Sequence, residues 1–307
     1  MEIIDTHSDT LIEIFENKEN LYKNNLHIDI KRMKRYSSYC QFFACFTHPK
    51  QEKNAKKYAV NAFSFFKEEL LKNKEHIGLA TNFREYCDLK SAGKITAFFS
   101  MENADAINRI CDLDLFYNLG VRMISLTWNF DNALATGVLG DEKRGVTEFG
   151  KQVIENMEEK NIILDVSHLN EKSFWDIAEL FKKPFVASHS NSYYVCNNKR
   201  NLTDEEFLEI KRRGGYVGMN FYPLFLTGEK NAKISDILKM TEHFLALGGE
   251  NIIGIGSDFD GVDCLPKGIF GVEHVEKIFN EMAKIGYSDE IMDKIAHKNF
   301  EKIIKLF

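Results

Sequence analysis

The chain has 307 residues, of which 44% are hydrophobic and 28% are charged, and it contains only 4 prolines. This composition is typical of a folded globular protein and excludes a chain that is disordered along its length. The 46 acidic side chains outnumber the 40 lysines and arginines. The resulting net charge of −6 argues against nucleic acid as a partner.

The apolar pattern gives no indication of a membrane partner. No apolar run approaches the roughly 20 residues that a helix needs to span a bilayer. The first residues, MEIIDTHSD, lack the basic start and the long apolar stretch of a signal peptide. We therefore expect a cytoplasmic protein with no membrane partner. The cysteines have no CxxC spacing, so we expect six free thiols: Cys40, Cys45, Cys87, Cys111, Cys196 and Cys264.

Short apolar segments alternate with helical patterns along the chain. The apolar segments predict eight strands, at Glu2–His7, Tyr39–Thr47, Ile95–Glu102, Arg122–Trp128, Ile162–His168, Phe185–Ser190, Tyr216–Tyr222 and Ile252–Asp258. Several of them, such as IILDV and NIIGIG, are continuously apolar, which is typical of strands buried on both faces. Apolar periodicity and capping residues predict helices at Lys53–Lys72, Val146–Lys160, Asn170–Phe181, Thr203–Arg213, Ile234–Leu247, Val272–Ile285 and Ser288–Leu306.

This alternation predicts an α/β fold, a single (β/α)8 TIM barrel that spans residues 1–307 as one domain. Length alone would also allow two domains, but no Pro- or Ser-rich linker divides the chain. A doubly wound open sheet is the structural alternative. Such a sheet usually has a glycine-rich loop after its first strand, where this chain reads DTHSDT without a glycine.

Imidazoles and carboxylates stand at the carboxyl ends of five predicted strands. In a barrel of this kind, the active site is built at that end from several strands at once. Each residue alone has an ordinary alternative role, as a hydrogen-bonded structural histidine or as a helix cap. Their coincidence predicts a metal site, formed by His7, Asp9, Glu102, His168 and His189, with Asp258 beside it.

The ligand types favour zinc, with manganese, cobalt or iron as alternatives, because the set mixes imidazole and carboxylate without thiolate. Five ligands exceed what one catalytic zinc usually holds, so we expect two Zn²⁺ ions that share Glu102. His7 and Asp9 would complete one ion, and His168 and His189 the other. A hydroxide between the ions would be the nucleophile.

One basic residue also falls near the predicted site. Arg200, in NNKRNLTDEE, lies on the same side of the barrel, and we expect it to bind the substrate rather than to form a solvated Lys–Arg pair. The other histidines fall in helical or loop stretches, and we interpret them as surface or structural residues: His27, His48, His76, His243, His274 and His297.

These motifs resemble the membrane dipeptidase family, peptidase family M19, within the metal-dependent amidohydrolases. The resemblance runs along nearly the whole chain, through DTHSDT, MEN, LTWNFDN, DVSH, ASHS, KRNLTD, GYVGMNFY, GIGSDFDG and HKNFEKI. It implies that the five residues above are the ligands of a binuclear centre. It also implies that Asp258 transfers protons and that Arg200 binds the substrate carboxylate. A homodimer is a further implication of the resemblance.

One position departs from the family pattern. Many relatives carry a histidine, thought to hold the substrate, where this chain has Trp128. Trp128 and Tyr222 follow predicted strands, and we expect them to line the substrate pocket, with barrel-rim packing as the alternative. We expect neither the signal peptide nor the lipid anchor of the mammalian relatives in this protein.

The resulting hypothesis is a dinuclear zinc dipeptidase acting on short dipeptides with a free C-terminal carboxylate. Asp258 would act as general base and then as general acid. A related hydrolase of N-acyl amino acids, other small amides or lactones is the main alternative. Barrels that bridge their metals with a carboxylated lysine fit less well, because Trp128 occupies that region and Glu102 is available. A non-catalytic metal-binding scaffold is the remote alternative.

Overall fold

Eight parallel strands close into a barrel in the computed structural model, which describes residues 1–307 apart from the side chains of Gln51 and Glu52. Hydrogen bonds join β1 to β2 and β2 to β4, and then each strand to the next until β9 pairs with β1. This confirms the predicted (β/α)8 barrel. The eight strands are β1 (Glu2–Ser8), β2 (Ser38–Phe46), β4 (Ile95–Glu102), β5 (Val121–Ser125), β6 (Ile163–Asp165), β7 (Val186–Ala187), β8 (Tyr216–Met219) and β9 (Ile253–Ile255).

A ninth strand, β3 (Ile77–Leu79), lies outside this ring and was not predicted. It pairs with Ile95–Ala97 at the start of β4, on the edge that β5 uses from Phe99 onward. A run of three residues is too short for periodicity to identify, so only the pairing with β4 defines it as a strand.

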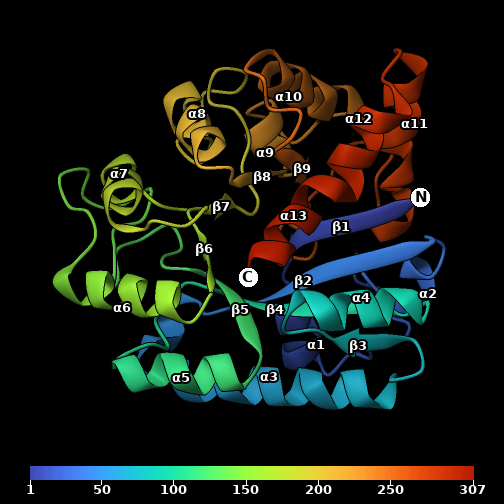
Figure 1. The fold of residues 1–307 in the computed structure, drawn as a ribbon. Helices are drawn as coiled ribbons and strands as arrows, with labels where there is room; N and C mark the ends of the chain where they lie inside the picture. Colours follow the sequence, from blue (N-terminus) through green and yellow to red (C-terminus); the bar gives the residue numbers. More distant parts are fainter.

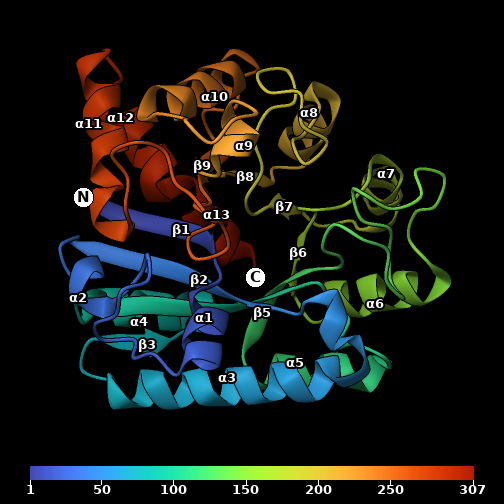
Figure 2. The same ribbon diagram turned by 180° about the vertical axis from the view of Figure 1, so that it is seen from behind.

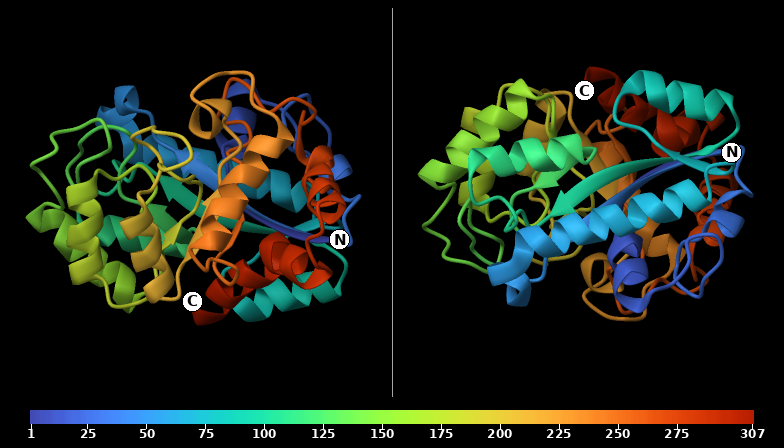
Figure 3. Two further views of the ribbon diagram at one scale, coloured as in Figure 1. Left: turned by 90° about the horizontal axis from the view of Figure 1, so that it is seen from above. Right: turned by 90° about the horizontal axis from the view of Figure 1, so that it is seen from below.

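Helices surround the strands on the outside of the barrel (Figures 1 and 2). Seen from above and from below, helices again lie over the strands (Figure 3). They are α1 (Thr10–Asn17), α2 (Ile30–Met33), α3 (Ala55–Lys72), α4 (Phe83–Ser91), α5 (Ile110–Asn118), α6 (Glu148–Glu159), α7 (Glu171–Leu180), α8 (Asp204–Arg212), α9 (Pro223–Leu226), α10 (Ile234–Ala246), α11 (Glu276–Lys284), α12 (Asp289–Asp293) and α13 (Asn299–Leu306).

The predicted helix starts agree with the caps that form. The side chains of Thr147, Asn170 and Thr203 each accept a hydrogen bond from a backbone N–H in the first turn, which satisfies a donor that the helix leaves free. Two predicted helices are interrupted. A 3₁₀ turn (Val272–His274) precedes α11, and a π-helical turn (Lys294–Lys298) joins α12 to α13.

Several strands end earlier than the sequence predicted, and this shapes the mouth of the barrel. The β6 ladder stops at Asp165 and the β9 ladder at Ile255, although the apolar pattern continues to His168 and Asp258. Both of these residues adopt a left-handed backbone, with φ of 71° and 61°. Non-glycine residues rarely adopt this conformation, and it turns their side chains out of the strand pattern.

Candidate metal centre

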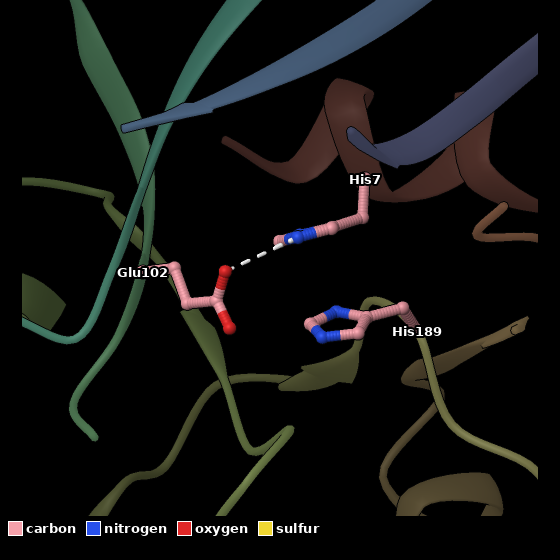
Figure 4. Close-up of side chains that lie close together, drawn as sticks. All are labelled: His7, Glu102 and His189. Carbon is pink, nitrogen blue, oxygen red and sulfur yellow. Dashed lines mark ion pairs between the residues drawn. The ribbon is translucent and has the colours of Figure 1, made fainter. Parts of the chain in front are cut away.

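Three side chains from distant parts of the chain point toward one another at the mouth of the barrel (Figure 4). His7 and Glu102 lie at the carboxyl ends of β1 and β4, and His189 follows β7 by two residues. One potential ligand atom from each of the three lies within 4.8 Å of the others. All three side chains are buried, and the rings of His7 and His189 stack with centroids 3.7 Å apart.

Glu102 stands between two sets of potential ligands. Its Oε2 lies 3.3 Å from His7 Nε2, and its Oε1 lies 2.8 Å from His168 Nε2. On the first side, Asp9 Oδ2 lies 3.4 Å from His7 Nε2. On the second side, His168 Nε2 and His189 Nε2 are 2.9 Å apart. The structure therefore brings together all five predicted ligands, with Glu102 at the centre.

The donor set fits divalent cations. His7 Nε2 and Asp9 Oδ1 are buried and have no hydrogen-bond partner among the described atoms. Burial and the nearby charge of Glu102 raise the pKa of Asp9 to about 7, as expected for carboxylates packed together without a cation. Burial and the neighbouring His7 lower the pKa of His189, which favours the neutral imidazole that binds metals.

The outer nitrogens of two imidazoles have acceptors that set their tautomers. His168 Nδ1 lies 2.8 Å from Asn129 Oδ1, and His189 Nδ1 lies 2.7 Å from Ser188 Oγ. The Ser188 hydroxyl also donates to Asp165 Oδ2, so its single hydrogen is used there and it accepts from His189 Nδ1–H. The Nε2 atoms of both rings are thus left unprotonated toward the cluster, as metal ligation requires.

Asp258 lies at the edge of the same cluster, with Oδ1 3.9 Å from His7 Nε2. Asn220 Nδ2 donates to Asp258 Oδ2 (2.8 Å), which holds the carboxylate in one orientation. Asp258 also forms a second metal-capable group with His7 and Asp9. A carboxylate in this place can receive a proton from a group bound between the ligands.

Arg200 is buried behind the histidine cluster. Its Nη1 donates to Ser190 Oγ (2.8 Å) and its Nη2 to the His189 carbonyl oxygen (2.9 Å), so the guanidinium is held in place. The Nε atom has no partner among the described atoms. The guanidinium lies 5.8 Å from the centre of the Phe225 ring.

Two cavities meet at His168, the one described residue that lines both. We call the cavity of about 550 Å³ the Asp258 chamber; it is lined by Asp9, Ile12, Glu13, Phe46, Glu102, Trp128, Asn129, His168, Tyr222, Phe225, Asp258, Asp260, Gly261, Val262 and Asp263. We call the cavity of about 580 Å³ the Arg200 chamber; its polar lining includes Ser190, Tyr193, Lys199, Arg200 and Lys172.

Trp128 and Tyr222 lie in the wall of the Asp258 chamber, whereas Arg200 lines only the other one. The Trp128 ring packs beside Phe46, with centroids 5.4 Å apart, and also lies 6.4 Å from His168. Tyr222 packs edge to face on Phe225. The three predicted substrate residues are therefore divided between two chambers.

Several residues near the site were not predicted. Asn129, Ser188 and Asn220 orient the histidines and Asp258, and none of them carries a signal in a single sequence. His27, interpreted from the sequence as surface or structural, accepts the Asp260 backbone N–H beside the Asp258 chamber. Glu13 follows Asp9, the N-cap of α1, by four residues, a spacing of about one helical turn that could have identified it.

A closed parallel barrel whose mouth gathers imidazoles and carboxylates in this way defines a metal-dependent hydrolase of the amidohydrolase type. The model of one family, membrane dipeptidase (peptidase family M19), matches residues 1–306. The chain belongs to this family and is a metallo-dipeptidase. The family resemblance and the hydrolase activity inferred from the sequence are both confirmed.

Relatives of known sequence and structure are similar to this chain along most of its length. An uncharacterized protein from Klebsiella pneumoniae is 34% identical over 204 residues, covering 63% of this chain and 75% of that protein. A crystal structure of a metallopeptidase from Rhodobacter sphaeroides, bound to a phosphinate mimic of L-Ala-D-Ala, is 26% identical with a TM-score of 0.92 over 99% of each chain. A dipeptidase of family M19 has 27% identity and a TM-score of 0.92, with 99% of this chain and 98% of the other covered.

Within the described residues, no helix combines the length and the apolar character needed to cross a bilayer.

Proposed function

We propose that this metallo-dipeptidase binds two zinc ions and cleaves dipeptides that have a free C-terminal carboxylate. The position of Glu102 carries the proposal, because its Oε2 faces His7 and its Oε1 faces His168. His7 and Asp9 would hold one ion, and His168 and His189 the other, with Glu102 shared. When bound, the ions would lower the pKa of a water molecule and polarise the scissile carbonyl.

Asp258 moves the protons in this proposal. Its Oδ2 is held by Asn220, which leaves Oδ1 directed toward His7 and the ligand cluster. From there Asp258 accepts a proton from the attacking water. It then delivers that proton to the nitrogen of the leaving amine as the peptide bond breaks.

Arg200 recognises the carboxylate of the second residue in this proposal. Its guanidinium is held by Ser190 and by the His189 carbonyl, so it is preorganised beside the ligands. A fixed guanidinium suits bidentate pairing with a carboxylate and would restrict substrates to those ending soon after the scissile bond. The first residue would then occupy the Asp258 chamber, against Trp128 and Tyr222.

The relative that was crystallised with a mimic of L-Ala-D-Ala supports including L-D dipeptides among the candidate substrates. We expect protein reconstituted with zinc to contain two ions per chain and to hydrolyse some L-L or L-D dipeptides, and we expect chelation to stop the reaction. Elemental analysis measures the zinc content, and assays with a stereochemically varied panel of dipeptides measure the hydrolysis. Cleavage of N-acyl amino acids or lactones, with no dipeptide cleaved, would contradict the substrate assignment and favour the alternative hydrolase.

A further inference from the structure

Charge is divided between the two chambers that meet at His168. The Asp258 chamber is lined by six carboxylates, and among its described lining residues there is no lysine or arginine. The Arg200 chamber is lined by Arg200, Lys172 and Lys199 together with three glutamates, so acidic side chains do not dominate it. A dipeptide whose carboxylate pairs with Arg200 therefore extends its first residue into surroundings that favour positive charge.

The carboxylates of the Asp258 chamber differ in what they contact. Asp9, Glu102 and Asp258 belong to the reaction centre. Asp260 accepts from Thr10 Oγ1 on one oxygen and from the His27 backbone N–H on the other (2.6 Å each). Asp263 pairs with Lys230, which lies outside the described lining of the chamber.

Glu13 is half-buried and has neither the two donors of Asp260 nor the lysine of Asp263. The one hydrogen bond to its side chain within the described residues comes from the Asn17 amide (2.9 Å), and no described lysine or arginine pairs with it. Lys18, on the same helix end, lies instead over the rings of Phe15 and Phe65. Burial, together with the charges of Asp260 and Glu16, raises the pKa of Glu13. A cation that enters the chamber would stabilise the charged form of this carboxylate.

The position of Glu13 indicates which part of a substrate it meets. The α-amino group of a dipeptide is two bonds from the scissile carbonyl, so it stays beside the metal ligands. Asp9 is the N-cap of α1, and Glu13 lies one turn further along the helix, about 5–6 Å along its axis. A cation that pairs with Glu13 would then belong to the side chain of the first residue rather than to its α-amino group. The chamber volume of about 550 Å³ leaves room for one.

The aromatic wall of the chamber suits the stem of such a side chain. Phe46 and Trp128 form one aromatic pair, and Tyr222 and Phe225 form another. Lysine and arginine side chains bury their methylene groups on apolar surface while the charged end reaches a carboxylate, and they are attracted to aromatic faces.

We propose that Glu13 is a specificity-determining residue that selects dipeptides whose first residue has a basic side chain. This inference rests on the proposed dipeptide hydrolysis and on the orientation that Arg200 imposes. It adds a substrate class, because the ligand cluster and Arg200 would accept any first residue.

The test compares L-Lys-D-Ala and L-Lys-L-Ala with the corresponding norleucine dipeptides, which have a similar length but no charge. We expect the zinc-loaded protein to cleave the preferred lysine diastereomer with a kcat/KM at least about tenfold higher than that of its norleucine counterpart, equivalent to about 1.4 kcal/mol. In Glu13→Gln this advantage should fall below about threefold while norleucine turnover is kept. Glu13→Asp should retain part of it.

Glu19→Gln is the control, because Glu19 lies two residues past the end of α1 and outside the described lining of the chamber. It should leave the preference unchanged. Equal cleavage of lysine and norleucine dipeptides by the parent protein would overturn the role of Glu13 while leaving dipeptide hydrolysis standing. An equal loss for both substrates in Glu13→Gln would do the same. Failure of the zinc-loaded protein to cleave any dipeptide would overturn both proposals.

Discussion

Replacing Ser188 by alanine tests whether the tautomer of His189 is set by its neighbour. The Ser188 hydroxyl donates to Asp165 and accepts from His189 Nδ1, so it links a buried carboxylate to a proposed metal ligand. Without the hydroxyl, Nδ1 loses its acceptor and the ring is free to carry its proton on Nε2, where it cannot ligate. Loss of a partner of this kind lowers metal affinity by about 10- to 100-fold, or roughly 1.4–2.7 kcal/mol.

Ser257→Ala provides a matched control at the carboxyl end of β9, two strands away from β7. Ser257 donates its backbone N–H and its hydroxyl to the two oxygens of Asp5, as Ser188 does to those of Asp165, but it does not contact an imidazole nitrogen. Each alanine variant leaves a buried carboxylate oxygen without its donor. We expect both to lower the free energy of unfolding of the metal-free protein by about 1–3 kcal/mol.

Metal affinity separates the two variants. Titration of metal-free protein with zinc against a competing chromophoric chelator should show the 10- to 100-fold weakening in Ser188→Ala and a smaller change in Ser257→Ala. Thermal unfolding of the same samples measures the loss of stability that the two variants have in common. Equal losses of zinc affinity in the two variants, or an unchanged affinity in Ser188→Ala, would refute the tautomer argument.

Three further predictions test other parts of the site. Asp258→Asn should lower kcat by about 10²- to 10⁴-fold while elemental analysis still finds metal, because only the proton transfer is removed; unchanged turnover would exclude that role. Glu102→Gln should reduce the metal content, since the central carboxylate would lose its charge; two fully retained ions would argue against a shared ligand. Burial raises the pKa of Glu206 to about 7, so its protonated form stabilises the fold below pH 4.5, and this contribution of roughly 3 kcal/mol is lost as pH rises through 7. Glu206→Gln, which keeps an acceptor for the Thr203 N–H, should therefore gain stability over the parent protein at pH 8 but not at pH 4.5 in urea unfolding, and parallel pH curves would contradict this.

The residues that could be predicted from the sequence are those whose position follows from local pattern. His7 and Glu102 end strands that the apolar runs identify, and the barrel alternation implies that such ends meet. The helix starts at Thr147 and Asn170 follow from capping chemistry within a single turn. In each case, the residues that determine the strand end or the helix start lie within a few positions of it in the sequence.

The features that could not be predicted depend on contacts between distant segments. β3 is defined only by its pairing with β4, and the end of the β9 ladder is set by its neighbours rather than by its own apolar residues. The division of the substrate residues into two chambers follows from the way Arg200 turns behind His189, and no spacing in the sequence encodes it.

Two contacts between a serine and an aspartate explain how very short strands can hold a precise centre. β7 contributes only Val186–Ala187 to the ladder, and β9 only Ile253–Ile255, so strand pairing ends before His189 and Asp258 are reached. At both places, the serine that precedes the functional residue binds an aspartate on the neighbouring strand through its N–H and its hydroxyl. These side-chain contacts continue the inter-strand connection where the backbone ladder stops. The backbone beyond the strand ends can therefore form the walls of the two chambers, while the serine–aspartate hydrogen bonds still hold His189 and Asp258 in position.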